Sequence, residues 1–173
     1  LAKEHLLLNS LTEIMKGARA EDLPERISEL VEKMKGMEKE LSGVRVAAAI
    51  SNVAELLKNA KQIGSATLIS TAMPNGLNAE ELRAVALSLK AKAENAIIVL
   101  SSVVENKVIL ISAISPEIIK LGIKAGELVK IGSAILGGGG GGKDDFAQGG
   151  GGSLNKVSEA FEEIEKTILS KLK

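Results

Sequence analysis

The chain has 173 residues, 45% of them hydrophobic, which is enough to bury the core of one sizeable domain or two small ones. Lysine plus arginine and aspartate plus glutamate each number 22, and this balance argues against a strongly basic, non-specific nucleic-acid binder. Aromatic residues make up only 1%, which argues against a protein that reads bases through many aromatic stacks. The chain has no cysteine and no apolar run long enough to span a bilayer, so we expect a cytoplasmic protein with no membrane partner and no thiolate zinc site. Because it begins at Leu1 and not at methionine, we expect a fragment of a longer protein.

The first third of the chain has the pattern of long helices. Residues 1–17 carry leucine and isoleucine at helical spacing, and Asp22 can cap a second helix that continues to about residue 62. This second helix shows a three-heptad apolar series that is typical of a coiled coil: Leu23, Ile27, Leu30, Met34, Met37, Leu41 and Val44. We expect an arm about 60 Å long at about 1.5 Å per residue, with residues 1–17 packed against it as an antiparallel hairpin. The alternative is a helical bundle packed on the rest of the protein.

From Gly64 onward the pattern predicts a compact α/β (α+β) subdomain with a small mixed sheet flanked by helices. The expected elements are a strand at 65–72, a helix begun by Asn78 and Glu81, strands at 96–104 and 107–114, short helices to about Leu136, a Gly-rich loop, and a last helix capped by Ser153. Both expected strands of the 96–114 hairpin are apolar on both faces, so we expect a covered sheet. The predicted domains are a helical arm at 1–63 and a globular subdomain at 64–173.

The glycine-rich segment is the strongest candidate for a binding site. Ten of the 18 glycines lie within residues 137–152, on both sides of a Lys-Asp-Asp-Phe-Ala-Gln insert. Bare backbone N–H groups beside the start of the last helix predict an anion-binding concavity, to which Lys143 adds charge and Gln148 an amide. The segment is not a Walker A loop, because Asp144 stands where serine or threonine would bind magnesium and because a helix precedes it. A flexible linker is the alternative.

At these residues the chain resembles a known family. The pattern GG-x-GGGK-x-DFAQGGG is similar to the signature of the Gly-rich domain that is associated with DHH phosphoesterases and that also ends alanyl-tRNA synthetases. The segment from Asp22 to Ile27, followed by the heptads, resembles the helical part that precedes this domain in the bacterial-type synthetases, where the whole region is called C-Ala. The family usually has arginine or lysine where this chain has Gly139, and proline where it has Asp144.

The resemblance implies a domain that binds tRNA for alanine at its outer corner and helps the aminoacylation and editing domains of the same chain to act on one tRNA. The tRNA-binding residues that we predict are Gly139, Gly140, Gly141, Gly142, Lys143, Gln148, Gly149 and Gly150, and the loop-structuring residues are Asp145 and Phe146. Basic side chains that could extend a phosphate track are Lys58, Lys61, Lys120, Lys124 and Lys130.

Catalysis is not expected of this fragment. His5 is the only histidine, and Asp144-Asp145 is the only acidic pair in the Gly-rich segment, so no catalytic or metal-binding set is complete. The resemblance implies that the intact protein is an alanine–tRNA ligase, with ATP and magnesium at its catalytic domain and zinc at its editing domain, while the fragment holds no cofactor. The arm could also form a homodimer. The alternatives are the substrate-binding domain of a DHH-type phosphoesterase or nuclease, and an oligomerisation domain.

Overall fold

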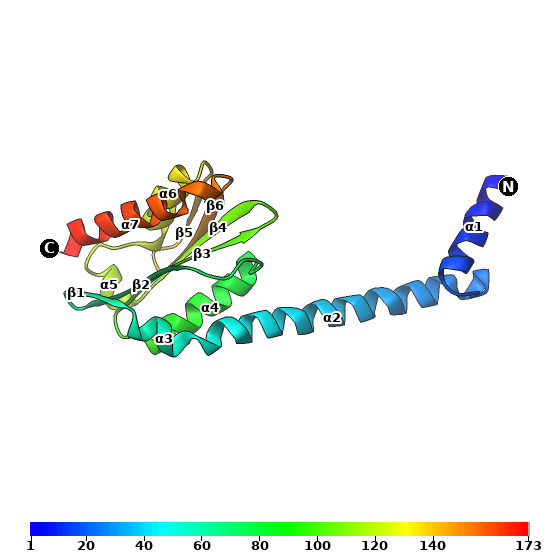
Figure 1. The fold of residues 1–173 in the computed structure, drawn as a ribbon, viewed down its shortest axis with the longest axis horizontal. Helices are drawn as coiled ribbons and strands as arrows, with labels where there is room; N and C mark the ends of the chain where they lie inside the picture. The colour runs from blue at the N-terminus through cyan, green and yellow to red at the C-terminus, as the bar shows by residue number, and fades with distance from the viewer. Residues whose placement is uncertain (173) are drawn as a thin grey trace. The chain divides into compact units, whose positions relative to one another are not determined.

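A computed structural model describes residues 1–172 of the protein, which divides into two compact units, residues 1–43 and residues 44 onward. Figure 1 shows the helices and strands in chain order. The division lies before the boundary that we expected between residues 63 and 64. The reason is that the last turns of helix α2 (Leu23–Ser51) and helix α3 (Val53–Lys58) belong to the second unit, where Ala49 and Val53 are buried in the core.

In the first unit, helix α1 (Ala2–Ile14) leads through a 3₁₀ turn, η1 (Ala20–Asp22), into α2. The antiparallel helical hairpin that we expected is absent, because no residue of α1 is buried and the Leu11 and Ile14 side chains are exposed. The chain reverses through the left-handed backbone of Lys16 and Gly17, and α1 then points away from α2 (Figure 1). The apolar face of α1 therefore contacts little of α2.

The expected continuous helix from 22 to 62 is also wrong. It ends at Ser51 and breaks at Asn52, where φ is −90° and ψ is 6°, before α3 begins at Val53. Asparagine is a poor helix former because its side chain competes for backbone hydrogen bonds. Val53, which follows the break, is buried in the core.

The second unit is built on a six-stranded mixed sheet in the order β1-β2-β3-β4-β6-β5. Strands β2 and β3 are parallel and all other pairs are antiparallel. The strands are β1 (Lys61–Ile63), β2 (Ala66–Ala72), β3 (Ala96–Val104), β4 (Lys107–Ile114), β5 (Gly140–Gly142) and β6 (Phe146–Gly151). The helices of this unit after α3 are α4 (Ala79–Lys92), α5 (Pro116–Ile119), α6 (Ala125–Ile135) and α7 (Val157–Leu172).

Local sequence signals explain the best-predicted elements. The Asn78 side chain accepts a hydrogen bond from the Glu81 N–H, and the Glu81 carboxylate accepts one from the Asn78 N–H, so the predicted capping box begins α4. Glu105 and Asn106 adopt φ values of 51° and 60°, as a two-residue hairpin between β3 and β4 requires. The predicted strands at 65–72, 96–104 and 107–114 are confirmed.

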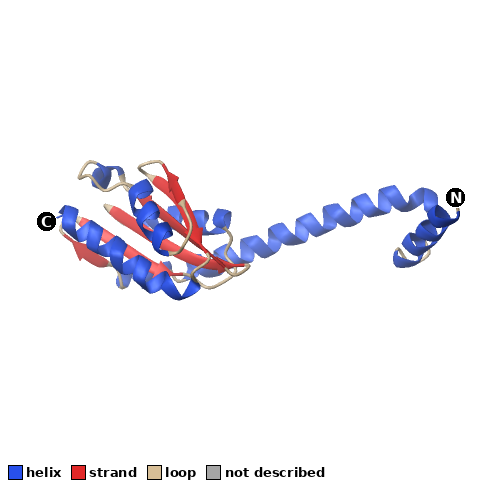
Figure 2. Cartoon of the chain, turned by 90° about the horizontal axis from the view of Figure 1, so that it is seen from above, coloured by secondary structure: helices blue, strands red, loops and turns tan. Residues whose placement is uncertain are grey.

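Helices cover both faces of the sheet, as expected from strands that are apolar on both sides (Figure 1 and Figure 2). On one face, α6 and α7 pack on side chains such as Leu68, Val99 and Leu110. On the other face, α4, α3 and the end of α2 pack on Ile98 and neighbouring residues. The predicted mixed sheet flanked by helices is therefore confirmed.

The Gly-rich segment is not a loop. Residues 140–142 and 146–151 form an antiparallel hairpin, with Gly140 opposite Gly149 and Gly142 opposite Ala147. Strand β6 also pairs with β4, so the hairpin extends the sheet and β5 is its edge. The glycines form strands despite their poor strand propensity because both partners, β4 and α6, lie close against them.

Candidate functional site

The turn between β5 and β6 is held by the N-terminus of α6. The Ala125 N–H donates to the Asp144 carbonyl at 2.8 Å, and the Gly126 N–H donates to the Lys143 carbonyl at 3.2 Å. These bonds satisfy amide groups that a helix start otherwise leaves unpaired. The position of Lys143 is therefore fixed by the sheet and the helix together, while its side chain remains exposed.

Asp145 and Phe146 both shape this turn through their backbone. The Ile114 N–H donates to the Asp145 carbonyl at 2.9 Å, and the Lys143 N–H donates to the Phe146 carbonyl at 2.9 Å. Within residues 1–172, no hydrogen bond or ion pair reaches the Asp145 carboxylate. The loop-structuring role that we expected from that side chain stays a prediction.

Four of the predicted tRNA-binding glycines lie where a side chain would collide with the protein itself: three against the hairpin or α6, and Gly150 against β4. A Cβ atom on Gly140 would lie 2.8 Å from Val129 Cγ1 on α6, and one on Gly142 would lie 2.7 Å from the Ala147 Cα. A Cβ on Gly149 would lie 2.7 Å from the Gly140 Cα. These glycines are thus required for packing, whatever else they do.

Gly139 and Gly141 are free of that constraint. A Cβ on Gly139 would meet nothing within 4 Å, and one on Gly141 would meet only a lysine methylene at 3.9 Å. Gln148 pairs with Gly141 across the hairpin and is exposed. Gly150 differs, because its φ is +154° and an added Cβ would overlap the Val108 carbonyl oxygen. The open part of the predicted site is therefore Gly139, Gly141 and Gln148.

A groove of about 320 Å³ lies between Arg83 of α4 and the part of the hairpin that contains Gly141 and Gln148. Arg83 of α4 stands over Phe146, with its guanidinium carbon 4.3 Å from the ring centroid. The groove is also lined by Gly141, Lys143, Asp145 and Gln148. Arg83 was not predicted, because nothing in the sequence links a helix position near residue 80 with a strand that begins at residue 146.

Within residues 1–172, some charged side chains near the groove have an oppositely charged partner and others have none. Within the part of the chain that the structure describes, no carboxylate pairs with the side chains of Arg83 or Lys143. The Asp144 carboxylate lies 4.0 Å from the Lys124 ammonium. The Lys130 stem passes beside Gly141, with its Cε 3.9 Å from the position of an added Cβ. Among the described residues, Arg83 and Lys143 thus line the groove with unpaired cationic groups, beside the unpaired carboxylate of Asp145.

The wider phosphate track that we predicted is largely occupied by ion pairs. Lys61 pairs with Glu165, and Lys120 pairs with Glu117 at 3.1 Å. Exposed pairs of this kind contribute little to stability, but each one lowers the positive charge available to a ligand. In the described part of the chain, none of the five lysines lines the groove, although the Lys130 stem passes beside Gly141.

The start of the last helix does not lie beside Lys143, contrary to our expectation. Ser153 makes no side-chain capping bond, and a 3₁₀ turn, η2 (Leu154–Lys156), precedes α7. Lys143 precedes β6 and Ser153 follows it, so a six-residue strand, about 20 Å at about 3.3 Å per residue, separates them. The predicted concavity of helix start plus Lys143 is therefore wrong, and Lys143 lies instead at the start of α6.

Comparison with known proteins agrees with the sequence motif and with this fold. Residues 61–170 match the DHHA1 domain. This chain belongs to the DHHA1 domain family. An alanine–tRNA ligase of Nocardia farcinica is 35% identical over 140 residues, which cover 79% of this chain and 16% of that protein. An alanine–tRNA ligase of Streptomyces avermitilis is 34% identical over 171 residues, covering 97% of this chain and 19% of that protein.

A solved structure supports the same assignment for this DHHA1 domain. The crystal structure of the C-Ala domain from Aquifex aeolicus alanyl-tRNA synthetase matches with a TM-score of 0.57 and 31% identity, covering 65% of this chain and 98% of that one. The resemblance to C-Ala that the Gly-rich motif indicated is thus confirmed. The chain spans less than a fifth of the length of the alanine–tRNA ligases described above.

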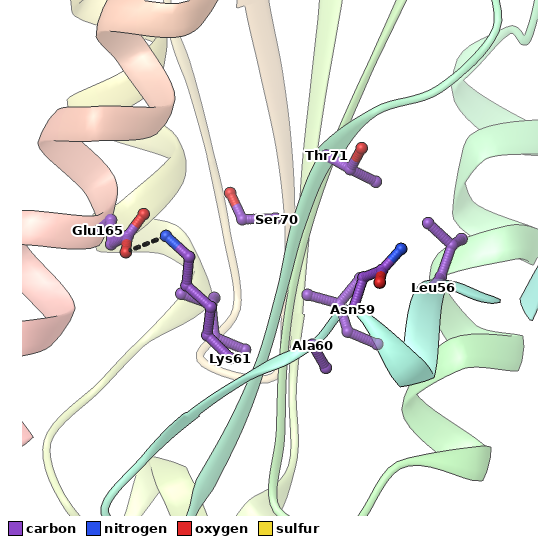
Figure 3. A pocket seen from close by; sticks show the side chains of 9 residues that line it. Leu56, Asn59, Ala60, Lys61, Ser70, Thr71 and Glu165 are labelled. Atoms are coloured by element: carbon purple, nitrogen blue, oxygen red, sulfur yellow. Dashed lines mark hydrogen bonds and ion pairs between the residues drawn. The ribbon is translucent and has the colours of Figure 1, made fainter. Parts of the chain in front are cut away.

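A second hollow of the DHHA1 domain lies at the edge of β2, with a volume of about 190 Å³ (Figure 3). Lys61 points across it to Glu165 of α7, and the two form an ion pair at 2.6 Å. Asn59 and, on β2, Ser70 and Thr71 supply further polar side chains. Since its one cation is already paired with a carboxylate, this hollow is a weaker anion site than the groove at Arg83.

The described residues contain no group of three or more histidine, cysteine, aspartate or glutamate side chains that could hold a metal ion. His5 lies on the exposed helix α1 in the first unit. Among residues 1–172, no helix has both the length and the apolar character that a membrane crossing needs.

Proposed function

We propose that this DHHA1 domain binds tRNA through the groove between α4 and the β5–β6 hairpin. The observation that carries the proposal is the unpaired Arg83 guanidinium on Phe146, beside Lys143 and the open face of Gly141. An RNA backbone needs cations and close access to the protein backbone, and the groove supplies both. The same region contains the motif that is similar to the alanyl-tRNA synthetases.

We propose further that the partner is tRNA for alanine and that the intact protein is an alanine–tRNA ligase. Support comes from the names of the relatives, which are 34% and 35% identical to this chain. In such an enzyme the domain would hold the outer corner of tRNA while aminoacylation and editing domains of the same chain act on it. ATP with magnesium and zinc would belong to those other domains. The relatives favour this function over the DHH-type phosphoesterase alternative.

The experiment is tRNA binding by variants of the full chain, measured by fluorescence anisotropy. Lys143→Glu should weaken tRNA binding about tenfold, which is about 1.4 kcal/mol, because a cation becomes an anion at the mouth of the groove. Gly141→Val should weaken binding by filling the open face without disturbing the sheet, since only one lysine methylene lies near. Gln148→Ala should have a smaller effect, because it removes one polar contact among several.

The matched control is Lys90→Glu, the same charge reversal on the partly buried Lys90 of α4. Thermal unfolding by circular dichroism checks that each variant is folded. If Lys143→Glu binds tRNA like the parent protein while Lys90→Glu does not, the RNA surface lies elsewhere and the groove is structural.

We also propose that the apolar stripe of α2 is a homodimer contact. Within the first unit, Leu30, Met34, Met37 and Leu41 are all more than half exposed, at 56%, 53%, 62% and 55%. Exposed apolar residues at heptad spacing are stabilised by a second helix, and the first unit does not place α1 on them. Sedimentation velocity of the full chain tests the dimer directly.

A further inference from the structure

Arg83 offers a ligand a flat surface as well as a charge. Its guanidinium lies over the ring of Phe146 at 4.3 Å from the centroid. The two side chains come from different elements, α4 and β6, so the stack holds the guanidinium in place from one side. Across the described residues, no carboxylate pairs with Arg83. Its outer face and its N–H groups are therefore available to a ligand.

The low aromatic content of the chain predicts little recognition of bases by stacking on rings. The structure offers a different stacking surface, the guanidinium of Arg83. Phe161 of α7 packs partly buried against the core, and one face of Phe146 is covered by Arg83. A guanidinium plane stacks on nucleobases as aromatic rings do. The Arg83–Phe146 pair thus forms a stacking surface that uses one of the two phenylalanines of the chain.

Beside that surface, the groove has room and polar groups at the right places for one nucleotide. Gln148 lies two residues beyond Phe146 on β6, so both side chains lie on the same face of the sheet. Gly141, opposite Gln148, leaves the space above the strand open. The Gln148 amide can both donate to and accept from the edge of a base. Lys143 is exposed at the end of the hairpin, where a phosphate can reach it.

We propose that the groove takes a single unstacked nucleotide of RNA, with its base on the outer face of the Arg83 guanidinium. Gln148 binds the edge of that base and Lys143 the adjoining phosphate. This inference rests on the proposed function and adds the class of ligand, an unpaired nucleotide and not a helical segment. Bases inside an A-form duplex stack on one another, so a duplex offers only its backbone to the groove.

The test uses the full chain and two single-stranded RNA probes of equal length, one of oligoadenylate and one with abasic riboses. Both probes carry the same phosphates, so the ratio of their dissociation constants reports the contribution of the bases alone. We expect the parent protein to bind oligoadenylate about tenfold more tightly. Arg83→Lys keeps the charge but removes the plane, and it should bring the ratio close to one. Phe146→Leu removes the supporting ring and should also lower the ratio.

The matched control is Arg26→Lys, the same exchange at an exposed arginine of α2, which should leave the ratio unchanged. Equal binding of the two probes by the parent protein would overturn the inference, and so would an unchanged ratio in Arg83→Lys. Either result leaves the proposed function intact if Lys143→Glu still weakens tRNA binding. Unaltered tRNA binding by Lys143→Glu would instead count against the groove as the tRNA site.

Discussion

The same substitution at two neighbouring glycines of β5 should change stability in opposite directions. A Cβ on Gly140 would lie 2.8 Å from Val129 Cγ1 and from the Gln148 carbonyl oxygen, so the hairpin would have to move off α6. Overpacking of this kind costs about 1–3 kcal/mol. A Cβ on Gly141 meets nothing closer than 3.9 Å, and alanine there reduces the freedom of the unfolded chain by about 0.4–1 kcal/mol.

We therefore expect Gly140→Ala to lower the free energy of unfolding by about 1–3 kcal/mol and Gly141→Ala to raise it by up to about 1 kcal/mol. Urea unfolding followed by far-UV circular dichroism measures both, because the chain has no tryptophan or tyrosine for fluorescence. The urea dependence of the unfolding free energy should be the same in both variants. Equal destabilisation by the two substitutions would mean that Gly141 is packed as closely as Gly140, and the prediction would be wrong.

Three further results are expected. Arg45→Ala should lower the unfolding free energy, measured by urea unfolding, by about 1–3 kcal/mol. The reason is that the Arg45 Nε–H donates at 2.9 Å to the carboxylate of Glu81, a side chain that is only 3% exposed. The double variant Leu30→Asp, Met37→Asp should abolish a dimer in sedimentation velocity and leave the second unit folded by circular dichroism; loss of that fold would contradict the two-unit division. The association constant for tRNA should depend only weakly on salt concentration, because residues 64–136 carry 7 basic and 6 acidic side chains. A steep fall of the association constant with salt would mean many phosphate contacts and would contradict this prediction.

Elements that are determined by residues close together in the chain could be predicted from the sequence. The Asn78–Glu81 box and the Glu105-Asn106 turn each depend on residues a few positions apart, and both elements begin and end near the predicted residues. Heptad spacing showed that α2 has an apolar face, but spacing does not identify the partner of that face. This is why the predicted pairing with residues 1–17 failed.

The site was predicted only in part, for a related reason. The Gly-rich motif identified a segment that lines the groove, yet glycines carry no strand signal of their own, so a loop was predicted in place of the β5–β6 hairpin. Its strand geometry comes from β4 and α6, which precede it in the chain. Arg83 meets Phe146 only after the chain folds, and a sequence pattern has no means of revealing such a contact.

The outer edge of the sheet is a strand of three glycines, and this has a consequence for self-association. An exposed edge strand offers unpaired backbone groups to any neighbouring chain, which is a common route to aggregation. Strand β5 is short and lacks side chains that could form a second sheet layer. It can therefore keep its backbone open to a ligand while remaining a poor template for another copy of itself.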